Sequence, residues 1–267
     1  MPSGRASRAR RHTPAAPVRE RRASPRVLVG AAVGVVVAAF AVALGIALTG
    51  GSSKKPAANV PAVGSLATAL PGADEVHALL AGIPQSGTRL GSPSAPVTLT
   101  EYVDLQCPYC QAFDTQVLPQ VVTRYVRTGK VQVVLRVWAF VGPDSFRGQS
   151  AVLAAGQQNK AFDLAQVLYD NQGTENTGWL SSQMVVSAAA SVPGLRVPQL
   201  LAEQSSASVH AQAASVDRLA RTDDVHSTPT LFVGKSGTHG SVVHLRSPTD
   251  TATITRAIDA ALKAQQA

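Results

Sequence analysis

Ten residues decide the fold of this chain, Glu101-Tyr102-Val103-Asp104-Leu105-Gln106-Cys107-Pro108-Tyr109-Cys110. They contain its only two cysteines, and two residues separate these cysteines. An apolar, β-branched run leads into the stretch, and a long helical pattern follows it. A helix N-terminus stabilises a thiolate through its free backbone N–H groups and its dipole, so a Cys-x-x-Cys at a strand–helix junction is typical of a redox site.

Two other interpretations of the cysteine pair are weaker. A zinc site needs four ligands, and the sequence has neither a second cysteine pair nor a His-x-His cluster. A disulfide that spans two residues restrains the unfolded chain very little, so it is a poor structural staple. We therefore favour redox chemistry and expect no metal and no organic cofactor.

The net charge of +8 is concentrated at the N-terminus. Residues 1–26 hold eight arginines and one acid, whereas the rest of the chain holds 16 basic and 15 acidic residues. The charge therefore does not indicate a nucleic-acid partner for the folded domain. We predict a disordered basic tail over residues 1–26.

An apolar segment of 22 residues without a charge follows, from Val27 to Leu48. A helix of this length spans about 33 Å, which is enough to cross the core of a bilayer. A cleaved signal peptide is the alternative, but signal h-regions run only about 7–15 residues, and no clear Ala-x-Ala follows here. We predict a single-pass anchor over 27–49 in a bacterial cytoplasmic membrane, with the N-terminus inside because the arginines precede the helix.

The rest of the chain reads as a flexible linker over 50–73 and one domain over 74–267. Within the domain the patterns predict, in order, a short helix over 74–81, an irregular stretch over 82–95, a strand over 96–103, a helix over 109–129 kinked at Pro119, a strand over 131–140, helices over about 144–224, strands over 228–233 and 241–246, and a helix over 250–265. The helices over 144–224 exceed an ordinary crossover, so we predict a helical insertion.

Two segments carry a resemblance to a known family. The stretch from Gly82 to Cys110 resembles the entry to the catalytic domain of membrane-anchored DsbA-like thiol–disulfide oxidoreductases of the thioredoxin superfamily. The stretch Ser227-Thr-Pro-Thr-Leu-Phe-Val-Gly234 resembles the cis-proline segment of that family. The resemblance implies an α/β, thioredoxin-like fold with a helical insertion.

The resemblance also implies roles for individual residues. Cys107 would be the exposed nucleophile and Cys110 the buried resolving cysteine. Pro229 would follow a cis peptide and would leave backbone groups of Thr228 free to bind an extended substrate, although Thr228-Pro229 alone would favour an ordinary trans proline at the start of an edge strand. Pro108 and the residue after it would contact the substrate.

Two acids before the cysteines and the tyrosine between them could influence the chemistry of the thiols. Glu101 would be a buried acid that shuttles the proton of Cys110, and the alternative is a strand-end glutamate that points to water. Asp104 is expected to be solvated or to cap the helix. Tyr109 stands where well-known oxidants of the family carry histidine, and it adds no charge, so the redox potential stays open.

The bulky residues Phe113, Trp138, Phe140 and Phe232 are expected in the core, and His226 is expected to be an exposed loop histidine. From these patterns we predict an extracytoplasmic enzyme that forms disulfides in exported, reduced or unfolded proteins and that a membrane redox partner reoxidises. Two alternatives stay open, namely a disulfide reductase or isomerase of the same fold and a non-catalytic peptide-binding module.

Overall fold

The computed structural model describes residues 60–266. The predicted basic tail, the predicted membrane anchor and the first part of the predicted linker lie outside the described residues. Among the residues that the structure describes, no helix is both long enough and apolar enough to cross a membrane.

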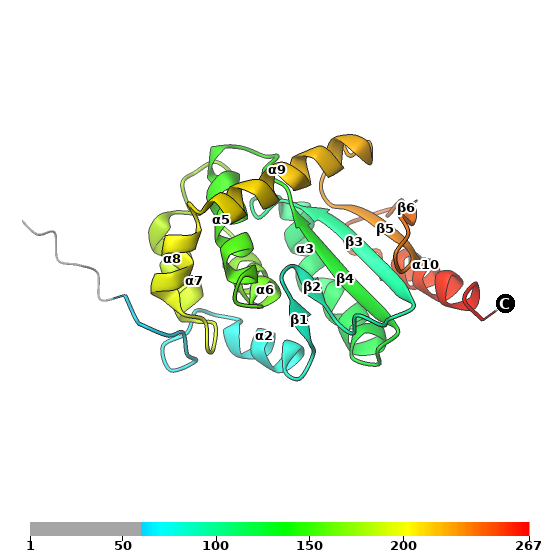
Figure 1. Ribbon diagram of the computed structural model, residues 1–267, viewed down its shortest axis with the longest axis horizontal. Coiled ribbons are helices and arrows are strands. Elements are labelled where there is room, and N and C mark those ends of the chain that lie inside the picture. Colours follow the sequence, from blue (N-terminus) through cyan, green and yellow to red (C-terminus); the bar gives the residue numbers. More distant parts are fainter. Residues whose placement is uncertain (1–59, 267) are drawn as a thin grey trace, which may run out of the picture. The chain divides into compact units, whose positions relative to one another are not determined.

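Six strands of the described residues form one mixed sheet in the order β1-β2-β4-β3-β5-β6 (Figure 1). The strands are β1 (Gln85–Ser86), β2 (Arg89–Leu90), β3 (Val97–Val103), β4 (Val131–Val137), β5 (Thr230–Lys235) and β6 (Ser241–Val243). β3 and β4 are central and parallel, whereas all other pairings are antiparallel. Because β3 and β4 are parallel, their carboxyl ends meet at the same edge of the sheet, where the cysteine motif follows.

The two faces of the sheet pack into different clusters because side chains alternate along each strand. Leu99 of β3, Val133 of β4 and Val233 of β5 are buried in the main core. Tyr102 and Phe232 lie in a second, smaller cluster on the opposite face. β3 and β4 therefore lie at the centre of the sheet and are covered on both faces.

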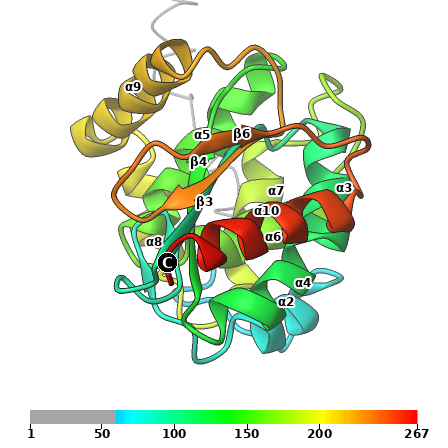
Figure 2. The ribbon, with the colours of Figure 1, turned by 90° about the vertical axis from the view of Figure 1, so that its right-hand side faces the viewer.

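The helices cover both faces of this sheet. They are α2 (Ala73–Leu80), α3 (Pro108–Gln116), α4 (Leu118–Val121), the π-helix η1 (Val122–Val126), α5 (Pro143–Gly156), α6 (Ala161–Asp170), α7 (Ser182–Ala190), α8 (Val197–Glu203), α9 (Ala207–Thr222) and α10 (Thr251–Lys263). Ile254 of α10 packs in the main core and Val216 of α9 in the second cluster, so α9 and α10 lie on opposite sides of the sheet (Figures 1 and 2). α5 to α9 follow β4 and form the predicted helical insertion.

Residues 60–72 belong to the folded domain, although the composition predicts a linker as far as residue 73. The backbone N–H of Gly64 donates to the carbonyl oxygen of Leu195 at 2.9 Å. The approach is so close that a Cβ at Gly64 would lie 2.2 Å from the carbonyl oxygen of Val192. The prediction of a linker is therefore wrong for residues 60–72, because backbone hydrogen bonds hold this segment against the connection between α7 and α8.

The stretch over 82–95, predicted as irregular, contains the β1–β2 hairpin. Leu90 pairs with Val133 of β4, and the N–H of Leu135 donates to the carbonyl oxygen of Thr88 at 2.9 Å. Strands of two residues carry no alternation that a sequence pattern can reveal, so only the pairing with β4 defines them.

The helix predicted over 109–129 is divided into α3, α4 and η1. Pro119 lies in the first turn of α4, and its ring cannot donate a backbone hydrogen bond to the preceding turn. Gly129 then ends the helical run in the left-handed region with φ of 72°. The predicted kink and stop are confirmed, but β4 ends at Val137, three residues earlier than the predicted strand.

Candidate active site

Asp104 shapes the loop between β3 and α3. Its Oδ1 accepts the backbone N–H of Gln106 at 2.8 Å, and its Oδ2 accepts those of Phe140 and Val141, both at 2.7 Å. The side chain is fully buried, so the expectation of a solvated residue is wrong. Three N–H donors replace water around this carboxylate. Asp104 thus ties the loop after β4 to the turn from which α3 begins.

Cys107 is the N-cap residue of α3, and Pro108 starts the helix. Both cysteines are free thiols in the structure. Cys107 is only 5% exposed, so the expectation of an exposed residue is wrong, because the loop of Thr228 packs against its sulfur. The hydrogen bond from the Cys110 thiol lowers the pKa of Cys107 to about 6, and the backbone N–H groups of Tyr109 and Cys110 act in the same direction. Near neutral pH most Cys107 is therefore the nucleophilic thiolate.

Cys110 has the opposite environment. It is fully buried, and burial raises the pKa of Cys110 well above its usual range, with the neighbouring Cys107 sulfur adding to the effect. The two thiols therefore separate into a thiolate that attacks and a thiol that keeps its proton. The resemblance assigns the same order of roles to the two cysteines.

The peptide bond between Thr228 and Pro229 is cis, as predicted. The thiol of Cys107 donates to the carbonyl oxygen of Thr228 at a distance of 3.3 Å. His226 in the same loop is exposed and lies 2.9 Å from a carboxylate oxygen of Asp224, so the prediction for this histidine is confirmed. The loop between α9 and β5 thus forms a wall of the site facing the cysteines.

Glu101 lies in β3 on the same face as Leu99 and Val103 of the main core, and none of its surface is exposed. Neither of its carboxylate oxygens has a hydrogen-bond partner among residues 60–266. Burial raises the pKa of Glu101 well above its usual range, and the charge of Asp114 adds to this shift. The side chain does not point to water, and a carboxyl that keeps its proton here suits exchange with a buried thiol.

The sequence reasoning missed Asp114 on α3, which is 1% exposed. Its Oδ1 accepts a hydrogen bond from Nε2 of Gln166 on α6 at 2.8 Å. Burial raises the pKa of Asp114 to about 8 despite this hydrogen bond. A signal was present, because Asp114 follows Cys110 by four residues and therefore lies on the same face of the helix.

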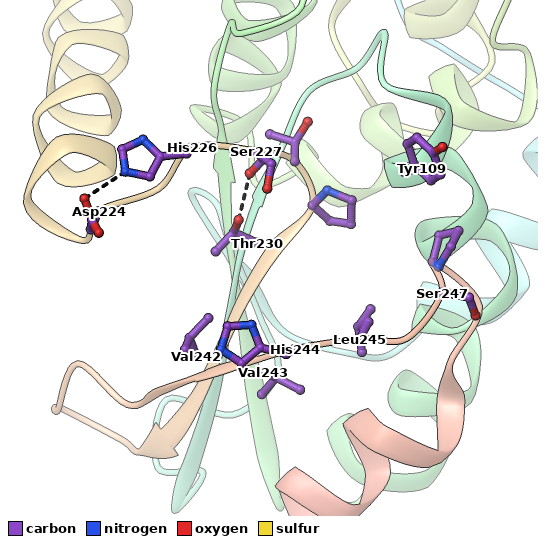
Figure 3. Close-up of a pocket in the computed structure, with 13 residues that line it drawn as sticks. Tyr109, Asp224, His226, Ser227, Thr230, Val242, Val243, His244, Leu245 and Ser247 are labelled. Carbon is purple, nitrogen blue, oxygen red and sulfur yellow. Dashed lines mark hydrogen bonds and ion pairs between the residues drawn. The ribbon is translucent and has the colours of Figure 1, made fainter.

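A groove of about 440 Å³ opens between α3, the cis-proline loop and β6 (Figure 3). Tyr109 borders it on the α3 side and is 61% exposed. Val242 and Leu245 contribute apolar surface, and Thr228 lines the same groove. The groove can therefore receive an extended peptide next to the Cys107 sulfur.

The four bulky residues predicted as core residues divide into two groups. Phe113 and Phe232 are buried, as predicted, whereas Trp138 is half-buried and Phe140 is 47% exposed. The rings of Trp138 and Phe140 lie 4.6 Å apart. The prediction for Phe140 is wrong because β4 ends before it and the residue lies in a surface loop.

A partly buried ionic cluster lies on the other face of the sheet, and sequence reasoning missed it. Asp223, which directly follows α9, accepts from Arg136 of β4 at 2.6 Å and from Tyr102 of β3 at 2.5 Å. His239, in the turn between β5 and β6, lies 2.7 Å from its other oxygen. The cluster fixes the residue from which the cis-proline loop starts.

Comparisons with known proteins agree with this geometry. The family model described as Thioredoxin matches residues 85–260. The probable disulfide bond formation protein D of Bacillus cereus is 29% identical over 149 residues, which cover 54% of this chain and 68% of that protein. A Na(+)/H(+) antiporter, NhaA 1 of Mycobacterium sp., is 31% identical over 182 residues, which cover 64% of this chain and 26% of the antiporter.

Among solved structures, that of oxidised BdbD from Bacillus subtilis has a TM-score of 0.59 and 21% sequence identity. The match covers 68% of this chain and 97% of that structure. At this level of identity the likeness concerns the fold, including the helices inserted between β4 and β5.

Proposed function

Because the chain belongs to the thioredoxin family and is a DsbA-like thiol–disulfide oxidoreductase, we propose that it forms disulfide bonds in exported proteins outside the cytoplasmic membrane. The environment of Cys107 is the observation that carries this proposal. Its pKa of about 6 means that the dithiol form holds a stabilised thiolate at neutral pH. Stabilisation of the reduced form makes the disulfide easier to give up, so this environment favours the oxidation of substrate thiols more than an unperturbed cysteine would.

The reaction begins on the disulfide form of the enzyme. A substrate thiolate attacks the Cys107 sulfur, the bond between the two cysteine sulfurs breaks, and Cys110 leaves with the electron pair and takes up a proton. A second substrate thiolate then attacks the substrate sulfur of the mixed disulfide and releases Cys107 as a thiolate. Two substrate thiols are thereby oxidised, and the enzyme disulfide is reduced to a dithiol.

Substrate binds in the groove between α3 and the cis-proline loop. An extended segment of a reduced or unfolded protein pairs with backbone groups of Thr228, in a form of strand addition. Pro108 and Tyr109 are both exposed on the α3 side and contact the same segment. This arrangement recognises backbone more than side chains, which suits many different clients.

The N-terminal sequence supports the proposed location. The apolar segment from Val27 to Leu48 acts as a single-pass anchor, and the arginines before it keep the N-terminus inside. The catalytic domain then lies outside the membrane, where disulfides form and persist. A membrane redox partner accepts the electrons of the dithiol and restores the disulfide.

The redox equilibrium between glutathione and the full chain in detergent micelles tests whether the enzyme oxidises or reduces its substrates. We expect a potential well above that of thioredoxin, about −270 mV, whereas a value near or below that of thioredoxin would favour a reductase. Thiol alkylation followed by mass spectrometry measures the oxidised fraction at each ratio of oxidised to reduced glutathione.

The two cysteines are tested by single substitutions, with oxidation of a reduced, unfolded protein as the assay. We expect Cys107→Ser and Cys110→Ser each to abolish turnover, and Cys110→Ser to accumulate mixed disulfides because the resolving thiol is absent. Full oxidase activity in either variant would contradict the assignment. Client binding without turnover by the wild type would instead select the peptide-binding module.

A further inference from the structure

The helical insertion reaches the redox site through the loop that joins α6 to α7. Residues 173–178 of this loop are exposed, yet the loop forms hydrogen bonds with the turn from which α3 begins. These bonds join positions that lie 65 to 70 residues apart in the chain. The insertion thus contacts the residues on either side of the sulfur-bearing position, which is the centre of the proposed chemistry.

Gln172 holds the backbone of the turn that carries Cys107. Its Nε2 donates to the carbonyl oxygen of Leu105 at 2.8 Å and to that of Cys107 at 3.2 Å. Because both acceptors are carbonyl oxygens, only the nitrogen end of the amide can serve them. The carbonyl oxygen of Cys107 also accepts the backbone N–H of Gln111 at 3.0 Å, in the first turn of α3. One amide group therefore ties the turn to the start of the helix.

A second set of hydrogen bonds holds the side chain of Gln106, the residue directly before Cys107. Gln106 has no exposed surface. Its Oε1 accepts the backbone N–H of Asn176 at 2.8 Å, and its Nε2 donates to Oδ1 of Asn176 at 3.3 Å and to Oγ of Ser145 on α5 at 3.0 Å. Asn176 has φ of 58°, a left-handed conformation that asparagine adopts more readily than most residues. In this conformation its backbone and its side chain meet the same amide group of Gln106.

Other contacts hold the loop to the domain without involving the turn. Nδ2 of Asn171 donates to the carbonyl oxygens of Pro71 and Val167 at 2.9 and 2.8 Å. Oδ2 of Asp144 on α5 accepts the backbone N–H of Gly178 at 3.0 Å. The hydrogen bonds to the turn can therefore be removed while the contacts at both ends of the loop remain.

The stabilisation of the Cys107 thiolate depends on the backbone that the loop holds. The backbone N–H groups of Tyr109 and Cys110 act on this sulfur, and its thiol donates to the carbonyl oxygen of Thr228 on the opposite side at 3.3 Å. Hydrogen bonds weaken steeply as their distance and angle change. A turn that is free to move would therefore lose part of this stabilisation even in a folded protein.

We propose that Gln172 and Gln106 are positioning residues of the redox site, and that the α6–α7 loop holds the Cys107 sulfur at the N-terminus of α3 through them. The inference rests on the proposed function and adds a part of the helical insertion to its site. Both residues act through the backbone of the turn and take no part in the exchange of electrons. A turn that is held less firmly would destabilise the dithiol form and make the enzyme a weaker oxidant.

Single substitutions in the full chain test the two positions. Gln172→Leu removes the donor to two carbonyl oxygens, and Gln106→Met removes the amide that Asn176 and Ser145 bind. For each variant we expect the pH of half-maximal alkylation of Cys107 to rise by about one unit, from about 6 to about 7, because one lost hydrogen bond and one pKa unit are of similar size.

The redox equilibrium with glutathione gives a second readout. A rise of this size leaves less thiolate in the dithiol form at pH 7, so the disulfide form becomes relatively more stable. The ratio of oxidised to reduced glutathione that oxidises half of the chain should then fall by about fivefold at pH 7 in Gln172→Leu and in Gln106→Met.

Asn171→Leu is the matched control. Asn171 precedes Gln172 in the same loop, and its amide also serves two carbonyl oxygens, but these lie outside the turn. We expect wild-type alkylation and a wild-type glutathione equilibrium in this variant. Gly142→Ala is an independent test, because an added Cβ would meet the side chain of Asn176 and displace it from Gln106. It changes no residue of the turn or the loop, and the half-maximal pH should again rise.

Urea unfolding of each variant separates positioning from stability. A purely structural role predicts a lower unfolding midpoint in urea with wild-type alkylation and a wild-type glutathione equilibrium, and this result would overturn the proposal. If Gln172→Leu does not fold, Gln106→Met and Gly142→Ala give the same test, and wild-type alkylation in both would reject it. A wild-type chain that does not oxidise substrate thiols would overturn the proposed function, whereas alkylation of the reduced chain would still decide whether the loop positions Cys107.

Discussion

Cys107 differs from an ordinary surface cysteine in the groups around its sulfur. The Cys110 thiol and two backbone N–H groups of the first helical turn stabilise its thiolate. We expect its alkylation rate to rise with pH to a half-maximum near pH 6. In Cys110→Ala the midpoint should move upward, toward the ordinary value of about 8.5, because the largest stabilising group is lost.

Iodoacetamide labelling of the reduced full chain, quenched and quantified by mass spectrometry, measures this midpoint. Unfolded chain in urea provides the reference for an unperturbed cysteine. An unchanged midpoint in Cys110→Ala would assign the low pKa of Cys107 to the helix N-terminus alone.

Asp114 should make the protein less stable as the pH rises. Its pKa is raised to about 8 in the folded state, whereas an unfolded aspartate titrates near about 3.9. Because the folded value is the higher one, the contribution of Asp114 is fully present below pH 4 and is lost as the pH rises toward 8. Asp114→Asn should therefore raise the free energy of unfolding at pH 7 by at least about 1 kcal/mol, with no such gain at pH 4.

Urea unfolding of the wild type and Asp114→Asn at several pH values tests this prediction. Glu175→Gln removes an exposed carboxylate and serves as the control for net charge. A gain that is equal at pH 4 and pH 7 would show that packing, not ionisation, separates Asp114→Asn from the wild type.

Residues close to the motif were predictable for a local reason. The positions of Cys107 and Cys110 follow from a strand that ends and a helix that begins, and both signals lie within ten residues. Asp104 was misjudged because its donors Phe140 and Val141 come from a distant loop. The spacing of Asp114 from Cys110 was a local signal, but its burial depends on contacts such as that with Gln166, which lies 52 residues further along the chain.

Among the secondary-structure elements, sequence periodicity predicts the long strands and helices and misses the short strands. β3 and β4 have seven residues each and were found, whereas β1 and β2 have two each and were not. Backbone hydrogen bonds likewise hold residues 60–72 in place, and the small residues and prolines there give a pattern that also suits a linker. The helices of the insertion were found because their apolar faces repeat over many turns.

Gly64 should decide whether the segment over 60–72 stays in place. A Cβ at this position would meet the carbonyl oxygens of Val192 and Ala189 at 2.2 and 2.4 Å, so the backbone must separate. We expect Gly64→Ala to lower the free energy of unfolding by about 1–3 kcal/mol. Hydrogen exchange should increase over 60–72, whereas Ser65→Ala, which keeps the backbone bond of Ser65 to Ala190, should leave it unchanged.

The ionic cluster around Asp223 joins α9, β3, β4 and the β5–β6 turn. Asp223→Asn should destabilise the protein by about 3 kcal/mol, because the partly buried Arg136 loses its counter-charge. The same change should lower the pKa of His239, which the hydrogen bond to Asp223 raises. Wild-type stability from this histidine is present below about pH 6.5 and is lost as the pH rises through its folded pKa.

Titration of the His239 ring by NMR and urea unfolding of the full chain measure the two effects. Asp224→Asn is the matched control, since Asp224 is the next residue and pairs only with the exposed His226 among the described residues. Equal losses in the two variants would mean that the cluster contributes no more than a surface pair.

For the whole molecule, the parts that decide its chemistry and its location lie at different ends of the chain. The structure describes the fold and the site over residues 60–266. The predicted anchor lies outside these residues and rests on hydropathy and charge alone. Whether the enzyme oxidises its substrates depends on the chemistry of the site and on the side of the membrane where the domain lies. A domain in the cytosol would meet a reducing poise that keeps most dithiols reduced, whatever the pKa of its first cysteine.

Labelling of bacterial cells that express the full chain tests the location. After mild reduction, a membrane-impermeant maleimide should modify Cys107 in intact cells. Val36→Arg places a charge at the centre of the apolar segment, where insertion then costs about 3 kcal/mol more, and we expect labelling only after the cells are permeabilised. Val36→Leu keeps the segment apolar and should be labelled like the wild type.

Both possible results bear on the function. Modification of the wild type in intact cells would mean that exported proteins meet the Cys107 sulfur as they emerge from the membrane. Modification only after permeabilisation would mean that the domain faces the cytosol. In that case the thiolate environment would serve reduction of substrates, and the proposed oxidising direction would be wrong together with the proposed location.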